Sequence, residues 1–133
     1  MDPSQINWLA VLAAALSSFL LGGLWYSPLL FHRPWLAAAG LSEEQLRKGT
    51  GAVFGGAFVC SLIAAVNLAF FLGAKATAGF GTFAGFAAGL GWVATGLTTT
   101  YLFERRPGRL TFIDAGYHVV SLTIMGAILG AWH

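Results

Sequence analysis

The stretch INWLAVLAAALSSFLLGGLWYS, residues 6–27, decides the fold of this chain. It carries no charged side chain, and its length matches the roughly 20 apolar residues that a helix needs to cross the hydrocarbon core of a bilayer. Residues 2–5 contain no basic side chain, whereas a secretory signal peptide begins with a basic segment. We therefore predict a retained membrane-spanning helix over residues 6–27.

Three further apolar stretches follow, at residues 51–74, 81–103 and 110–132. Only short turns separate the last three stretches, and short turns make neighbouring helices run antiparallel. The sequence thus predicts an all-α membrane protein, a bundle of four antiparallel transmembrane helices in which residues 1–133 form a single membrane domain.

The composition excludes an ordinary soluble domain. Hydrophobic residues make up 57% of the chain and charged residues 9%, whereas about 25% are charged in typical globular proteins. The formal net charge of +2 does not indicate nucleic-acid binding, because the basic residues lie between the apolar stretches and form no basic face. The lipid bilayer is the partner that the composition predicts.

The connector at residues 28–49 has the pattern of two short helices lying at the membrane surface. Pro28 ends the first spanning helix, because the residue before a proline is driven out of the helical region. Gly40 separates the two short helices. Ser42 and Gln45 have the spacing of a capping box at the start of the second one.

The basic residues also predict the orientation. Six of the 7 lie in the connectors at residues 28–49 and 104–109, and Lys75 stands alone in the turn between them. Loops this short obey the positive-inside rule, so both connectors are expected in the cytoplasm and both termini outside or in the periplasm.

Small residues recur at intervals of four, which lets helix backbones approach closely in lipid. These spacings predict helix-packing faces either within the chain or between copies of it, so a homo-oligomer or a larger membrane complex is expected. The glycines concerned are Gly51, Gly55, Gly81, Gly85, Gly89, Gly126 and Gly130.

Ionisable side chains at membrane depth are functional candidates, because placing them there costs free energy. Asp114 and His118 lie one turn apart near the start of the fourth apolar stretch. One interpretation is a proton-responsive pair; the other is structural, since Thr111 and Asp114 also have capping-box spacing. The candidate polar cluster in the cytoplasmic third comprises Tyr26, Thr98, Thr99, Asp114, Tyr117 and His118.

The other polar and aromatic residues at membrane depth have simpler interpretations. Asn67 is expected to form an interhelical hydrogen bond, and the threonines to bond back to their own helix. Most aromatic side chains fall near predicted helix ends, where tryptophan and tyrosine anchor a helix at the interface. These expected anchors are Trp8, Trp25, Tyr26, Trp35 and Trp132, whereas Trp92 falls in mid-helix.

The sequence contains none of the common catalytic or metal-binding motifs. It has no Ser-His-Asp pattern, no phosphate-binding glycine loop and no metal-ligand cluster, and its single cysteine, Cys60, lies within an apolar stretch. We therefore expect no enzymatic activity, no catalytic residue, no metal and no cofactor.

The amino-terminal motif carries a resemblance. The order and spacing of NWLAV at residues 7–11, GGLWYSPLLF at 22–31 and AGLSEE at 39–44 resemble the bacterial membrane-protein family named domain of unknown function 1761. The resemblance covers the full length and implies a small protein with about four membrane helices, and hence a bacterial inner membrane. It implies no activity.

Three functions remain open at this point. The favoured one is a structural or accessory subunit that packs through its glycine faces. The first alternative is a small oligomeric transporter or channel that uses Asp114 and His118. The second is the binding of an apolar cofactor or lipid between helices, in which Trp92 would take part.

Overall fold

The computed structural model describes residues 3–133, and these residues form helices without any strand. Four helical spans are long and apolar enough to cross a membrane, which confirms the predicted number of spans and the all-α class. These spans are α1 (Trp8–Trp25), α4 (Thr50–Leu72), the continuous segment Ala78–Phe103 and α7 (Gly108–Ala131). Each boundary lies within a few residues of the prediction.

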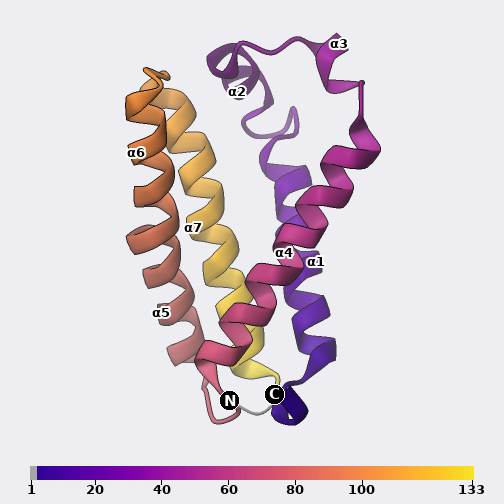
Figure 1. Cartoon of the computed structure of the whole chain (residues 1–133), viewed down its shortest axis with the longest axis vertical. Coiled ribbons are helices and arrows are strands. Elements are labelled where there is room, and N and C mark those ends of the chain that lie inside the picture. The colour runs from indigo at the N-terminus through magenta and orange to yellow at the C-terminus, as the bar shows by residue number, and fades with distance from the viewer. Residues whose placement is uncertain (1–2) are drawn as a thin grey trace.

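Successive long helices alternate in direction (Figure 1). The two termini and the short turn between α4 and the third span lie at one end of the molecule. The connector with α2 (His32–Ala39) and α3 (Glu43–Leu46), and the turn before α7, lie at the other end. The two base-rich connectors therefore share one end, which we call the basic end.

Local hydrogen bonds explain where α1 and α3 begin. The Asn7 side chain accepts hydrogen bonds from the backbone N–H groups of Leu9 and Ala10, which otherwise lack partners at a helix start. Ser42 and Gln45 form the predicted capping box. Gly40 ends α2 with a φ of 72°, a left-handed conformation that glycine adopts without steric cost.

The capping box expected at Thr111 and Asp114 is wrong. Helix α7 already begins at Gly108, after Pro107, so Thr111 lies within its first turn and Asp114 in its second. The turn before α7 is shorter than expected, because the helix resumes directly after the proline. Asp114 therefore has no capping role.

The third span is continuous but not uniform. It consists of α5 (Ala78–Ala88), the π-helical segment η2 (Gly89–Ala94) and α6 (Thr95–Phe103). It begins at Ala78 because the Thr77 side chain accepts from the Phe80 N–H and caps this helix. The wider π turn carries Trp92, which is 77% exposed on the outside of the bundle.

Helices α5 and α7 pack backbone to backbone along their glycines. A Cβ atom on Gly81 would lie 2.1 Å from the carbonyl oxygen of Gly126, and one on Gly85 would lie 2.0 Å from that of Leu122. Gly130 meets the Thr77 carbonyl equally closely. We call this contact the glycine seam; it shows that these glycines serve packing within the chain.

Helix α4 packs differently. Its second half contributes Ala65, Leu68 and Leu72 to a buried core shared with α1 and α7. Its first half leans away from α6 and α7 toward the basic end (Figure 1). Gly51 and Gly55 lie in this half. A Cβ atom at either position would have no other heavy atom within 4 Å, so their spacing serves no contact in this chain.

Candidate functional site

Asp114 binds two tyrosines near the basic end. The Tyr26 hydroxyl donates to one carboxylate oxygen at 2.7 Å, and the Tyr101 hydroxyl donates to the other at 2.7 Å. Tyr26 caps the end of α1, Tyr101 lies in α6, and Asp114 lies in α7. The carboxylate therefore ties three helices together; we call this arrangement the Asp114 clamp.

The two hydrogen bonds of the clamp differ in the sequence distance that they span. Tyr101 and Asp114 face each other across the tight turn between α6 and α7, only 13 residues apart. Tyr26 lies 88 residues from Asp114 and is held in place because its N–H bonds to the Gly22 carbonyl at the end of α1. One half of the clamp is thus local, and the other half depends on the whole fold.

Aromatic side chains cover the clamp. The Tyr26 ring lies 4.9 Å from the Trp35 ring of α2 and 5.7 Å from the Tyr117 ring of α7. Beside it, the Trp25 indole N–H donates to the Ile113 carbonyl at 2.9 Å. These rings pack against the Tyr26 side of the clamp, where the hydroxyl–carboxylate bond is part-buried.

A second polar layer lies deeper in the bundle. The Tyr117 hydroxyl donates to the Ser18 carbonyl at 2.8 Å and lies 3.1 Å from the Ser18 hydroxyl. Ser121 donates to the Ser18 hydroxyl at 2.7 Å. Ser18 and Ser121 are 5% and 3% exposed, so this layer is closed and ties α1 to α7 at mid-depth.

The polar layers stop at Ser18. Toward the opposite end, α1 and α4 bury Ala14, Ala15 and Ala65 completely, and Val11 is 3% exposed. These residues offer no hydroxyl or carboxylate that could continue a line of hydrogen bonds. Within residues 3–133, the two connected polar layers therefore reach from the basic end only to about mid-depth.

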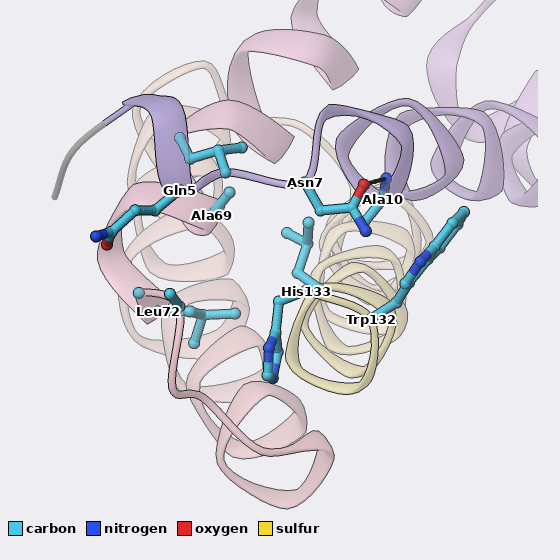
Figure 2. A pocket seen from close by; sticks show the side chains of 11 residues that line it. Gln5, Asn7, Ala10, Ala69, Leu72, Trp132 and His133 are labelled. Atoms are coloured by element: carbon cyan, nitrogen blue, oxygen red, sulfur yellow. Dashed lines mark hydrogen bonds between the residues drawn. The ribbon is translucent and has the colours of Figure 1, made fainter.

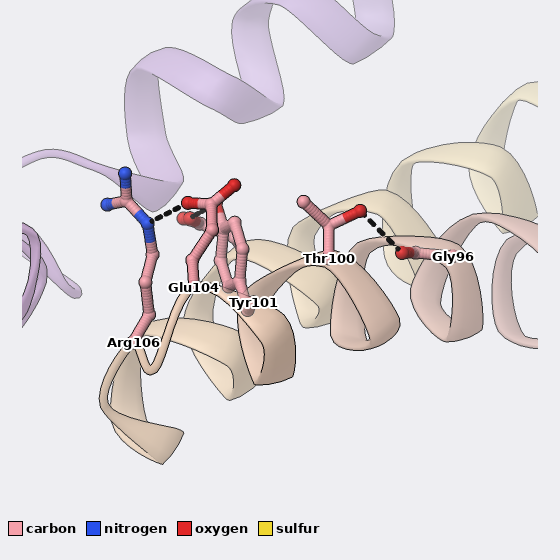
Figure 3. Close-up of polar contacts among 6 residues, drawn as sticks. Gly96, Thr100, Tyr101, Glu104 and Arg106 are labelled. Atoms are coloured by element: carbon pink, nitrogen blue, oxygen red, sulfur yellow. Dashed lines mark hydrogen bonds and ion pairs between the residues drawn. The ribbon is translucent and has the colours of Figure 1, made fainter.

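A charged pair borders the clamp on the outside. Arg106 donates to Glu104 at 2.7 Å, and its guanidinium lies 5.4 Å from the Tyr101 ring centre. Figure 3 shows this pair beside Tyr101, and shows Thr100 bonded to the carbonyl of Gly96 in its own helix. Arg106 thus holds the aromatic ring whose hydroxyl reaches Asp114.

The structure brings together only part of the expected polar cluster. Tyr26 and Asp114 are bonded, and Tyr117 lies against Tyr26. Thr98 and Thr99 do not join them, since each donates to a carbonyl of its own helix. His118 is half-buried beside the Tyr117 ring and forms no side-chain hydrogen bond within residues 3–133.

Four residues bond across helices although the expected polar cluster did not include them, and one of them, Trp25, was expected as an interface anchor: Tyr101, Ser18, Ser121 and Trp25. The one usable sign in the sequence was the tight turn at 104–107, because residues on both sides of a helical hairpin turn face each other. Nothing comparable marks the two serines.

The expected interface anchors divide into two groups. Trp8 and Trp132 are 51% and 47% exposed at the end that holds the termini, where they can face the membrane surface. Trp25, Tyr26 and Trp35 instead pack inside the chain at the basic end. Those three side chains join helices in addition to any contact with the interface.

A small cavity lies at the end opposite the clamp (Figure 2). Its volume is about 20 Å³, room for a water molecule but not for an organic cofactor. Asn7, Trp132 and His133 are among its lining residues, and His133 bonds to the Ala76 carbonyl. No group of metal-binding side chains occurs among residues 3–133.

The surface connector carries one titratable contact. The His32 imidazole lies 2.5 Å from a Glu43 carboxylate oxygen and also bonds to the Tyr26 carbonyl. The hydrogen bond to Glu43 raises the pKa of His32 above its ordinary value. The contact with Glu43 joins the two short helices, and the bond to the Tyr26 carbonyl links the connector to the clamp.

Comparison with known proteins places the chain in a recognised group. A family model described as "Protein of unknown function (DUF1761)" matches residues 9–130. This match confirms the family expected from the amino-terminal motif. Curated proteins and solved structures gave no match.

Proposed function

We propose a function for this chain, which belongs to the DUF1761 family: it is a structural or accessory subunit that acts through helix–helix packing and catalyses no reaction. Its four apolar spans make it a multi-pass membrane protein. We place it in a bacterial inner membrane, associated with further copies of itself or with a larger complex.

The Asp114 clamp is the observation that carries this proposal. Both carboxylate oxygens accept tyrosine hydroxyls at 2.7 Å, and the Trp35 ring packs against Tyr26. Each carboxylate oxygen is thus engaged by a hydroxyl from a different helix. Among residues 3–133, the carboxylate that lies at membrane depth therefore joins helices, which is the task of a structural element.

The orientation belongs to the same proposal. The connectors with most of the basic residues share one end, and Lys75 lies in the turn at the other end. By the positive-inside rule the basic end faces the cytoplasm and the termini face outward. A cysteine replacing Lys48, in a Cys60→Ser background, should react with an impermeant maleimide only after the inner membrane is opened; labelling of intact spheroplasts would reverse the orientation.

Native mass spectrometry after gentle extraction tests the proposed role. We expect particles that contain more than one chain of this protein or this chain bound to other subunits. A particle with the mass of a single 14.0 kDa chain, at concentrations close to those in the membrane, would contradict the proposal. An added small-molecule mass that survives washing would instead favour the binding of an apolar cofactor.

One observation favours a transporter as the second candidate. His118 lies one turn from Asp114, half-buried at membrane depth and without a hydrogen-bond partner within residues 3–133. Unpaired ionisable groups there are candidates for proton transfer. Proton flux into vesicles that is abolished by both Asp114→Asn and His118→Ala would replace the structural proposal; flux no faster than in protein-free vesicles agrees with it.

A further inference from the structure

Asn67 leaves part of its amide unused at membrane depth. Its side-chain N–H donates to the Ile63 carbonyl of its own helix at 3.0 Å, while its oxygen accepts no hydrogen bond within residues 3–133. The side chain is exposed on α4, five residues before the helix ends, or about 8 Å along the axis. Hydrocarbon cannot supply the missing bonds, so this position is costly unless another helix covers it.

Asn67 shares its helix face with Gly56, Cys60 and Ile63. These four residues are spaced by four, three and four positions, the spacing of a seam between two paired helices, and all are exposed. We call them the α4 seam. It points away from the face that buries Ala65 and Leu68 in the bundle, so the fold of the chain makes no use of it.

The outer face of α1 differs from the α4 seam in composition. It exposes a row of large leucines, among them Leu12, Leu16 and Leu20. The α4 seam instead combines a glycine, a cysteine and an amide, which offer little contact to lipid chains but allow close approach and hydrogen bonding to a helix. Exposed threonines differ from Asn67 because their single hydroxyl donor is used within their own helix. The Thr99 hydroxyl, for example, donates to the Thr95 carbonyl.

We propose that the α4 seam binds a second copy of this chain, with the two α4 helices parallel about a two-fold axis along the membrane normal. An amide both donates and accepts, so two Asn67 side chains at the same depth complement each other. Copies inserted in the same orientation place identical residues level, which an isologous interface requires. Gly56 lets the two helices approach. This inference rests on the proposed function, which leaves the partner open, and it names that partner as a second copy of the chain.

The chain carries its own probe, because Cys60 is its only cysteine and lies in the α4 seam. Oxidation with copper-phenanthroline in native membranes should give a disulfide-linked dimer. A Cys60→Ser variant carrying Ala52→Cys, one turn before Gly56 on the same face and nearer the water, should crosslink as well. A Cys60→Ser variant carrying Leu16→Cys, on the leucine face of α1, is the matched control and should stay monomeric.

The amide is tested separately by native mass spectrometry. Asn67→Leu should convert most of the dimer to monomer, whereas Thr99→Val, which also removes an exposed polar group, should leave the dimer unchanged. Retention of the dimer in Asn67→Leu, or crosslinking at Leu16→Cys but not at Cys60 or Ala52→Cys, would overturn the α4 seam. A complex held with other subunits through another face would overturn this inference and leave the proposed function standing; a lone chain would overturn both.

Discussion

The glycine seam and the Asp114 clamp hold the same bundle by different means. The glycine seam joins α5 to α7 by removing side chains until backbone atoms touch, as at Gly85 and the Leu122 carbonyl. The Asp114 clamp joins α1, α6 and α7 through hydroxyls on a single carboxylate. The former relies on shape alone, and the latter on polar groups whose bonds lipid cannot replace.

This difference teaches where the chain tolerates change. A packed backbone contact has no flexible end that could move aside, so any added atom must displace a helix. A hydroxyl bonded to a carboxylate can be deleted while the ring that carries it stays in place. We therefore expect steep losses at the glycine seam and graded losses at the clamp.

The largest effect is expected from Gly85→Leu. A Cβ at this position would lie 2.0 Å from the Leu122 carbonyl oxygen, so α5 and α7 must separate. We expect the free energy of unfolding to fall by about 3 kcal/mol or more. Unfolding by dodecyl sulfate in mixed micelles, followed by circular dichroism, measures the change.

Gly55→Leu is the matched control for that variant. The same substitution is made on a helix of similar character, but nothing lies within 4 Å of its Cβ. The stability of the monomer should stay within about 0.5 kcal/mol of the parent protein. Equal losses in the two variants would show that the glycine seam does not hold the bundle.

The next largest effect is expected at the clamp, from Asp114→Asn. One oxygen still accepts a tyrosine hydroxyl, but an NH₂ group now faces the other hydroxyl, which must turn away and accept instead of donate, so its O–H loses the carboxylate as acceptor. We expect a loss of about 1 to 3 kcal/mol in the same unfolding measurement. Thr98→Val, which removes a hydroxyl bonded only to its own helix, should have little effect; a loss as large as that of Asp114→Asn would contradict the clamp.

Removing one hydroxyl at a time separates the two halves of the clamp. Tyr26→Phe should cost about 1 kcal/mol and Tyr101→Phe less, because Tyr26 joins distant helices beneath aromatic rings while Tyr101 lies beside the exposed Arg106. A double-mutant cycle of Tyr26→Phe with Asp114→Ala should show coupling of about 1 kcal/mol. Strictly additive losses would mean that this bond contributes nothing.

The smallest effect concerns the connector that lies over the clamp. Because Glu43 raises the pKa of His32, their contact contributes stability below the ordinary histidine pKa of about 6.5 and loses it as the pH rises through the folded value. NMR titration in nanodiscs should give a pKa for His32 above the ordinary value. Glu43→Gln should bring it back toward that value, and an unchanged pKa in this variant would exclude the contact.

Much of the fold could be predicted from the sequence. Uninterrupted apolar length gave the four spans, and turn residues gave the short surface helices and the capping box at Ser42. The rotation of each helix could not be predicted, because helices in lipid are apolar on every side and carry no amphipathic period. For this reason the buried interhelical bond between Ser18 and Ser121 could not be predicted.

The candidate site was predicted in part for the same reason. Depth along each helix can be counted from the sequence, which placed Tyr26, Asp114 and Tyr117 at one level. Which side chains face inward cannot be counted, so Thr98 and Thr99 were included and Tyr101 was left out. Glycine spacing has the same weakness: Gly51 and Gly81 each begin a row of glycines spaced by four, but only Gly81 meets a helix of this chain.

The separation of 88 positions between Tyr26 and Asp114 has a consequence for biosynthesis. Tyr26 is synthesised long before Asp114, its hydrogen-bond acceptor. Three further helices must therefore be made and inserted before α1 can form this bond. The Tyr26 hydroxyl lies near the water during that time and can remain hydrated. The last helix then brings the carboxylate that binds Tyr26, so a chain cut short before α7 would lack the bond that joins its first helix to its last.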